Sequence, residues 1–327
     1  MTPVAEGGTL IALIALGIAA YLALCARLYA QITRVPPDSP IFDLLDDPAA
    51  FSIGGIDCRP YLMPRYETVE FRDRSGTVGI AGWLIPAHAA LDAPTVVIVH
   101  GYTASRRDPT VLLAAGMLHR HGFAVLAIDL RNHGDSGRTG GRHTGGVRES
   151  ADVLGAWDWL VHDRHQPAER VGLLGFSLGA ASVLIAAGHE PGVAAVWADS
   201  SYGDIDEATA AELRRSRLPT FLLPGGRLVA RLLDGPGLTA VDPIHGIAAM
   251  TGRAAFVTHG TADSRLDVRY ADELIRAAGT AGVRIESWIV EGAEHTRAIL
   301  EHPAEYEQRL VAFFGRALTG GAPSARP

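Results

Sequence analysis

The sequence contains no lysine, so all 29 of its basic side chains are arginines. Its 36 acidic residues give a net charge of −7, which argues against the basic surface that nucleic-acid binding requires. Only two cysteines occur, Cys25 in an apolar run and Cys58 in a predicted loop, so we expect no disulfide. Neither a Cys-x-x-Cys nor a His-Glu-x-x-His spacing is present, and we therefore expect neither a metal ion nor another cofactor.

The amino terminus lacks the basic leader of a secretory signal peptide. Residues 1–6 carry no Lys or Arg, and residues 7–26 form an uncharged run rich in Leu, Ile and Ala. A helix of this length crosses the roughly 30 Å core of a bilayer, so residues 1–30 are predicted to be a single-pass transmembrane anchor. A helix buried on the domain surface is the alternative. Because Arg27 and Arg34 follow the run, the rest of the chain is expected on the cytoplasmic side of the cell membrane.

Beyond the anchor, apolar strands alternate with helices from residue 66 to residue 320, which predicts an α/β domain with a mostly parallel, doubly wound sheet. The proline-rich segment 31–65 is predicted to be a linker, and residues 321–327 a flexible tail. Strands are expected at residues 66–71, 80–85, 95–99, 124–128, 171–174, 194–198, 254–258 and 284–290. The helices expected around them begin after Asp108 and occupy residues 147–161, 180–187, 206–217, 227–233, 268–278 and 303–318.

One serine lies at the junction of a strand and a helix, in the stretch Gly175-Phe-Ser177-Leu-Gly179. In this context the motif Gly-x-Ser-x-Gly predicts a nucleophile elbow, a tight turn that holds the serine at the strand tip. Gly175 and Gly179 have no β-carbon that would clash with the neighbouring strand and helix. The N–H of Leu178 is predicted to be one of two donors of an oxyanion hole. A glycine-rich turn without chemistry is the alternative interpretation.

Two further loops end in residues that complete acyl-transfer chemistry. Asp263 follows the predicted strand 254–258, and His295 follows the last strand. A serine needs a base that takes its proton, and the base needs a carboxylate that fixes its tautomer. Ser177, His295 and Asp263 are therefore the predicted catalytic residues.

These motifs, in this order, resemble the α/β-hydrolase superfamily over about residues 66–318. The motifs that carry the resemblance are His100-Gly101, Asp129-x-Arg-x-His-Gly134, the elbow, His259-Gly-x-x-Asp263 and Gly292-x-x-His295, with Gly146-x-x-Glu149-x-x-Asp152 before the elbow. Within the superfamily the sequence is similar to serine esterases and acylaminoacyl-peptidase-like enzymes, including membrane-anchored bacterial hydrolases. The resemblance implies that the Tyr102 N–H is the second oxyanion donor.

Alternatives remain for two of the catalytic positions. Asp267 and Asp199 compete with Asp263, since some hydrolases carry the acid on the strand after the elbow, where Asp199 lies. His302 follows His295 closely but opens the closing helix. His100 is expected to orient the oxyanion loop, and the motif Asp129-x-Arg-x-His to fasten a loop, rather than to take part in chemistry.

The alternation of strands and helices stops between residues 201 and 250, which predicts a helical lid. Its apolar residues Phe221, Leu222 and Leu223 favour a lid that covers a pocket or one that meets the membrane; a solvated connection is the alternative.

The sequence thus predicts a membrane-anchored serine hydrolase of the carboxylesterase type. It should cleave esters or thioesters, of small-molecule or lipid-like substrates, through an acyl-Ser177 intermediate and without a cofactor. Amide cleavage, as in acylaminoacyl-peptidase-like enzymes, is the closest alternative, although no β-propeller partner of those peptidases is seen in the chain. A catalytically silent α/β-hydrolase fold that serves as a membrane-bound binding module is the alternative from another class.

Overall fold

The structure is a computed structural model that describes residues 3–37, 47–87, 93–234 and 241–319. The predicted tail and parts of the predicted linker and lid lie outside these residues. The described chain divides into two units, residues 1–34 with 206–240, and residues 35–205 with 241–327.

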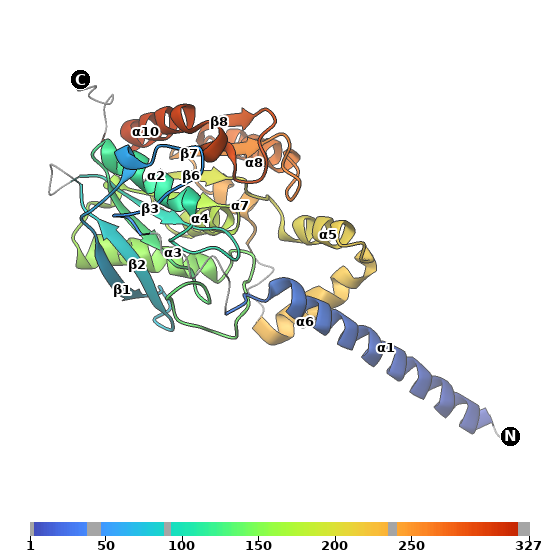
Figure 1. Ribbon diagram of the computed structural model, residues 1–327. Coiled ribbons are helices and arrows are strands. Elements are labelled where there is room, and N and C mark those ends of the chain that lie inside the picture. Colours follow the sequence, from blue (N-terminus) through green and yellow to red (C-terminus); the bar gives the residue numbers. More distant parts are fainter. Residues whose placement is uncertain (1–2, 38–46, 88–92, 235–240, 320–327) are drawn as a thin grey trace. The chain divides into compact units, whose positions relative to one another are not determined.

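The larger unit is built on one eight-stranded sheet (Figure 1). Its strand order is β1-β2-β4-β3-β5-β6-β7-β8; β2 pairs antiparallel with both β1 and β4, and the strands from β4 to β8 run parallel. The strands are β1 (Glu67–Arg72), β2 (Gly79–Ile85), β3 (Thr95–Val99), β4 (Ala124–Ile128), β5 (Val171–Phe176), β6 (Ala195–Asp199), β7 (Ala254–Gly260) and β8 (Arg284–Val290). The predicted mostly parallel α/β sheet is confirmed.

Helices cover both faces of this sheet and bury two apolar layers (Figure 1). One face packs against α3 (Glu149–Asp158), α4 (Leu178–His189), α7 (Pro243–Ala248) and α8 (Arg269–Thr280). The other packs against α2 (Pro109–Arg120), α9 (Ala298–Glu301) and α10 (Pro303–Thr319). Short helical turns are η1 (Arg59–Tyr61), η2 (Trp159–Asp163) and η3 (Ala168–Arg170). Because the central strands are buried on both faces, they read as continuous apolar runs in the sequence.

Helix α2 shows how the sequence fixes an element locally. The Asp108 side chain accepts a hydrogen bond from the Thr110 N–H, and Pro109 occupies the first helical position. A carboxylate cap satisfies a donor that has no partner within the helix, and proline has no N–H to lose there. The helix start predicted after Asp108 is therefore confirmed.

The smaller unit consists of α1 (Pro3–Thr33), α5 (Ile205–Arg215), η4 (Thr220–Leu222) and α6 (Leu223–Asp234). Within α1, residues Thr9–Thr33 are long and apolar enough to cross a membrane, and the most apolar 18 of them have a mean hydropathy of 2.4. Helix α6 begins four residues earlier than the predicted helix 227–233 and packs along α1. The lid role of this segment stays a prediction.

Candidate active site

The turn between β5 and α4 holds Ser177 in a conformation that side chains rarely adopt, with φ 53° and ψ −114°. Such a backbone costs about 1–3 kcal/mol and persists only where the surroundings enforce it. A β-carbon on Gly175 would lie 2.3 Å from the Gly179 carbonyl oxygen, and one on Gly179 would lie 2.3 Å from the Val99 carbonyl oxygen. Both positions therefore require glycine, and the turn has the geometry expected of a nucleophile elbow.

Three side chains meet at the carboxyl ends of the central strands, and they are the three predicted from the sequence. His295 Nε2 lies 2.8 Å from the Ser177 hydroxyl, and His295 Nδ1 lies 2.7 Å from Asp263 Oδ2. The Asp263 side chain is fully buried, whereas His295 is 12% exposed. Because the carboxylate can only accept, Nδ1 carries the proton and Nε2 accepts from the serine hydroxyl. This tautomer is the one a general base requires.

Asp263 is held in place by four donors. Its Oδ1 accepts from the backbone N–H groups of Arg265 at 2.9 Å and Leu266 at 2.8 Å. Its Oδ2 lies 3.1 Å from His259 Nε2 and accepts from His295. Burial alone would raise the pKa of Asp263, but the hydrogen bonds from His259 and His295 outweigh it and hold the pKa well below its usual range. The carboxylate therefore stays ionised at neutral pH.

No role was predicted for His259, although it opens the motif His259-Gly-x-x-Asp263. His259 is fully buried at the end of β7, and its Nε2 also lies 2.9 Å from the Leu266 carbonyl oxygen. Burial lowers the pKa of His259, but the hydrogen bond to Asp263 raises it by more than that. The pKa of His259 therefore lies above its usual value. The available signal was a His at the end of the predicted sheet strand and an Asp four residues later in the loop that follows.

Asp199, the alternative acid, has other partners. The Tyr306 hydroxyl donates to its Oδ2 at 2.9 Å and the Ser200 hydroxyl to its Oδ1 at 2.9 Å. Burial raises the pKa of Asp199 to about 6. The Ser200 oxygen in turn accepts from the Thr296 N–H at 3.1 Å, so Asp199 supports the loop that carries His295 without bonding to its ring.

The other two alternatives also serve local structure. Asp267 accepts from the Arg269 N–H at 2.9 Å, at the start of α8. The His302 ring lies against Trp288, with 6.2 Å between the ring centroids. His295 and Asp263 are therefore the pair that the structure places beside Ser177.

The predicted oxyanion donors lie next to the nucleophile. Leu178 is the first residue of α4, where backbone N–H groups have no partner within the helix. A β-carbon on Gly101 would lie 3.4 Å from the Ser177 β-carbon, so the loop that contains Tyr102 passes close to the serine. His100 fastens this loop, since its Nε2 accepts from the Leu130 N–H at 3.0 Å and its Nδ1 donates to the Gly101 carbonyl at 2.7 Å. Burial lowers the pKa of His100 to about 4 and keeps the ring neutral.

Buried ion pairs fasten the neighbouring loops, as the sequence analysis expected. Asp129 pairs with the Arg106 guanidinium, and Asp152 with that of Arg131 at 2.6 Å. Glu149 accepts from the Thr144 hydroxyl at 2.8 Å and closes the loop before α3. None of these groups contacts the triad side chains, so they position loops rather than take part in chemistry.

His133, in the loop after β4, should make the fold sensitive to acid. Burial and the neighbouring His100 lower the pKa of His133 to about 3, whereas an unfolded histidine titrates near pH ~6.5. As the pH falls, the unfolded chain binds this proton before the folded chain does. The folded state therefore has its full stability with respect to His133 above pH ~6.5 and loses it progressively as the pH falls toward 3. Between pH 7.5 and 5.0, His133 should lower the free energy of unfolding by about 2 kcal/mol, and a His133→Asn variant should lack this loss.

Urea unfolding of the full chain in detergent at the two pH values measures this effect. The difference in stability between wild type and variant should change by about 2 kcal/mol, because the other titrating groups cancel in the comparison. If the free energy of unfolding changed equally with pH in the wild type and the variant, the conclusion that His133 is buried and neutral would be contradicted.

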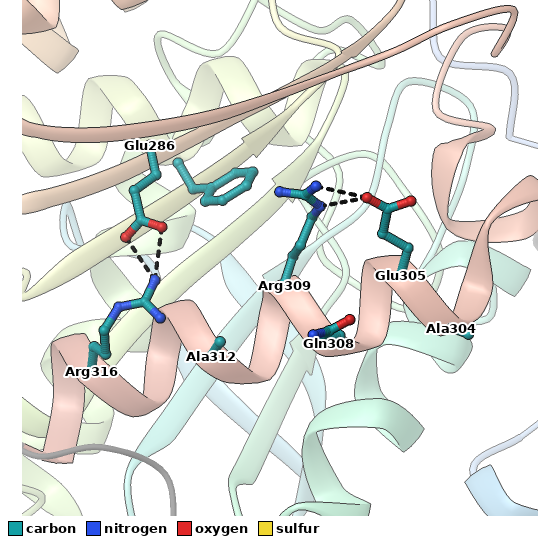
Figure 2. Close-up of a pocket in the computed structure, with 8 residues that line it drawn as sticks. Glu286, Ala304, Glu305, Gln308, Arg309, Ala312 and Arg316 are labelled. Atoms are coloured by element: carbon teal, nitrogen blue, oxygen red, sulfur yellow. Dashed lines mark hydrogen bonds and ion pairs between the residues drawn. The ribbon is translucent and has the colours of Figure 1, made fainter.

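Two grooves on the larger unit are lined by residues outside the triad. One of about 550 Å³ runs between β8 and α10, where Arg316 reaches Glu286 at 2.7 Å and Arg309 reaches Glu305 at 2.7 Å (Figure 2). None of its lining residues belongs to the triad. Among the residues that the structure describes, no group of three or more His, Cys, Asp or Glu side chains is placed to hold a metal ion.

Residues 94–255 match the family described as alpha/beta hydrolase fold. The esterase Pf2001 of Pyrococcus furiosus is similar in structure, with a TM-score of 0.63 and 24% identity over 82% of this chain and 98% of that one. The acylaminoacyl peptidase of Pyrococcus horikoshii has a TM-score of 0.55 and 18% identity over 77% of this chain and 42% of its own. An uncharacterized 31.7 kDa protein of Escherichia coli is 26% identical over 156 residues, which are 47% of this chain and about half, 53%, of that protein.

The sheet order, the elbow between β5 and α4, and these matches define a protein of the α/β-hydrolase fold. The α/β-hydrolase fold that the motifs predicted is therefore confirmed.

Proposed function

We propose that the chain is a serine hydrolase that cleaves carboxylic esters or thioesters through an acyl-Ser177 intermediate. The observation that carries the proposal is the continuous line of hydrogen bonds from Ser177 through His295 to Asp263, at 2.8 and 2.7 Å. A hydroxyl holds its proton at neutral pH, and this arrangement places a base within reach of that proton.

The reaction follows from the positions of these atoms. As the Ser177 oxygen attacks the ester carbonyl, His295 Nε2 takes its proton, and the ionised Asp263 stabilises the imidazolium that forms. The N–H groups of Leu178 and Tyr102 stabilise the tetrahedral oxyanion, each by about 3 kcal/mol. His295 then gives the proton to the leaving alcohol. A water molecule, activated by the same histidine, releases the acid and restores Ser177.

Helix α1 is proposed to anchor this enzyme in the cell membrane, with the catalytic domain on the cytoplasmic side. Its segment Thr9–Thr33 has the length and hydropathy for a single crossing, Arg27 lies near its carboxyl end, and Arg34 directly follows it. Small-molecule or lipid-like esters are the proposed substrates. Amide cleavage is the second candidate, supported by the structural similarity to an acylaminoacyl peptidase.

A fluorophosphonate probe tests the proposal, because it reacts with a serine only where a base and an oxyanion hole activate it. The full chain in detergent should take up one equivalent, and mass spectrometry should locate the adduct on Ser177. A Ser177→Ala variant should take up none.

Ser182→Ala is the matched control. Ser182 lies further along α4, is buried, and donates to the Leu178 carbonyl at 2.7 Å without touching the triad. This variant should label like the wild type. Folded protein that takes up no probe would instead support the silent binding module, and an adduct on another serine would show that the nucleophile lies elsewhere.

A further inference from the structure

Helix α6 is fastened to α1 by specific contacts within the smaller unit. The Tyr21 hydroxyl donates to the Phe221 carbonyl at 2.8 Å and accepts from the Gly225 N–H at 3.1 Å. The rings of Tyr21 and Phe221 stack with centroids 6.3 Å apart, and the Cys25 thiol lies 3.6 Å from the Leu222 carbonyl oxygen. The insertion therefore docks on the apolar amino-terminal helix.

Gly225 sets how closely the two helices approach. A β-carbon at this position would lie 2.4 Å from the Cys25 sulfur and 2.7 Å from the Tyr21 ring. Glycine allows such contact between helices, as it does between helices packed in membranes. Gly225 thus has a packing role, and Pro224, Gly225 and Gly226 all lie within the helix.

The apolar surface of α1 continues onto α6. Along α6, Gly225 and Val229 are buried, whereas Leu228, Leu232 and Leu233 are exposed, with Leu232 exposed to 74%. Phe221, which stacks on Tyr21, is itself exposed to 64%. Large exposed apolar patches mark surfaces that meet another apolar phase. The patch on α6 is contiguous with a helix that can cross a bilayer.

The opposite side of α6 is charged. Arg227 and Arg231 lie one turn apart, and Arg227 pairs with Asp206 of α5 at 2.9 Å. A helix with leucines on one side and arginines on the other matches the pattern of a helix that lies in the interface between lipid and water. Arginine there faces the phosphates of the headgroups.

We propose that Phe221 and α6 form a second membrane-contacting element, an interfacial helix docked on the anchor, whose partner is the lipid bilayer. The proposal rests on the membrane anchor given under Proposed function. The position of α6 along the anchor agrees with this proposal. Residues 9–20 of α1 are all exposed, and the contacts with α6 begin only at Tyr21. The uncharged run 7–26 is about 30 Å long, which matches the hydrocarbon core, so the contacts of Tyr21 and Cys25 with α6 lie near the end where α1 leaves that core.

This geometry places Tyr21 and Phe221 close to the membrane interface. Aromatic rings with a polar group are enriched at that level of a bilayer. The leucines of α6 would then enter the boundary between headgroups and acyl chains beside the anchor.

Spin labels on the full chain in liposomes test the proposal. Single cysteines at Leu232 and at Arg231, each in a Cys25→Ala/Cys58→Ala background, compare the two sides of one helix. The label at position 232 should be several-fold more accessible to oxygen, which concentrates in lipid, than to a water-soluble nickel chelate. The label at position 231 should show the reverse preference.

Exposure of position 232 to the aqueous reagent would overturn the proposal. Exclusion of both reagents would overturn it as well, since the leucines would then be covered by protein, either the catalytic cleft or a second copy. A Leu16→Cys label separates this result from failure of the anchor, because it reports lipid contact of α1 alone. Fluorophosphonate labelling of the same samples reports the triad independently of both.

Discussion

Replacing Asp263 with Asn should lower kcat for p-nitrophenyl ester hydrolysis by about 10⁴-fold. The amide oxygen can still accept from the N–H groups of Arg265 and Leu266, which leaves the amide nitrogen facing His295. An amide that donates to Nδ1 selects the tautomer with the proton on Nε2, and that nitrogen can no longer accept from Ser177. The expected loss corresponds to about 5.5 kcal/mol of transition-state stabilisation.

Asp199→Asn is the control, because it makes the same chemical change in the alternative acid. Asp199 is bound by the hydroxyls of Tyr306 and Ser200, so its variant should keep kcat within about tenfold of the wild type. Steady-state rates and thermal midpoints of both variants give the comparison. If Asp199→Asn loses the greater part of the activity and Asp263→Asn keeps it, the acid has been assigned to the wrong strand.

Three of the eight strands could be predicted to the residue. The strands at 95–99, 124–128 and 284–290 agree with the structure at both ends. The first two are continuous apolar runs because both faces of these strands are buried. The predicted strand 171–174 is longer in the structure and ends at Phe176, since the elbow turns only at Ser177.

The residues of the candidate site could be predicted because each of them follows the end of a predicted strand. Ser177, Asp263 and His295 are far apart in sequence, yet parallel strands bring their carboxyl ends to one edge of the sheet. His259 was missed as a partner of Asp263 because a histidine inside a buried strand gives no sign of which way its ring points.

The pairing of α1 with α6 could not be predicted from the sequence. It joins Tyr21 to Phe221 and Gly225, about 200 residues away, through one hydroxyl and one glycine. The expected start of this helix at residue 227 was wrong, since α6 begins at Leu223 and includes Pro224, Gly225 and Gly226. A proline is tolerated in the first turn of a helix. Glycine is required at position 225 because a β-carbon there would clash with Cys25 and Tyr21.

Replacing Gly179 with Ala should leave little folded protein. The new β-carbon would lie 2.3 Å from the Val99 carbonyl oxygen and 2.5 Å from that of His100. Both oxygens belong to backbone, the first in β3 at the centre of the sheet, so neither can move like the end of a flexible side chain. Overpacking of a rigid core costs about 1–3 kcal/mol or more, which is a large part of the stability of a domain.

Gly279→Ala is the matched control, since it makes the same change near the end of α8. No atom lies within 4 Å of the β-carbon that this variant would add. There alanine should stabilise the helix by up to about 1 kcal/mol. Thermal unfolding and the yield of fluorophosphonate-labelled protein measure both variants. Because the two substitutions differ only in their surroundings, a wild-type midpoint for Gly179→Ala would show that the elbow is not packed against β3 as tightly as these distances require.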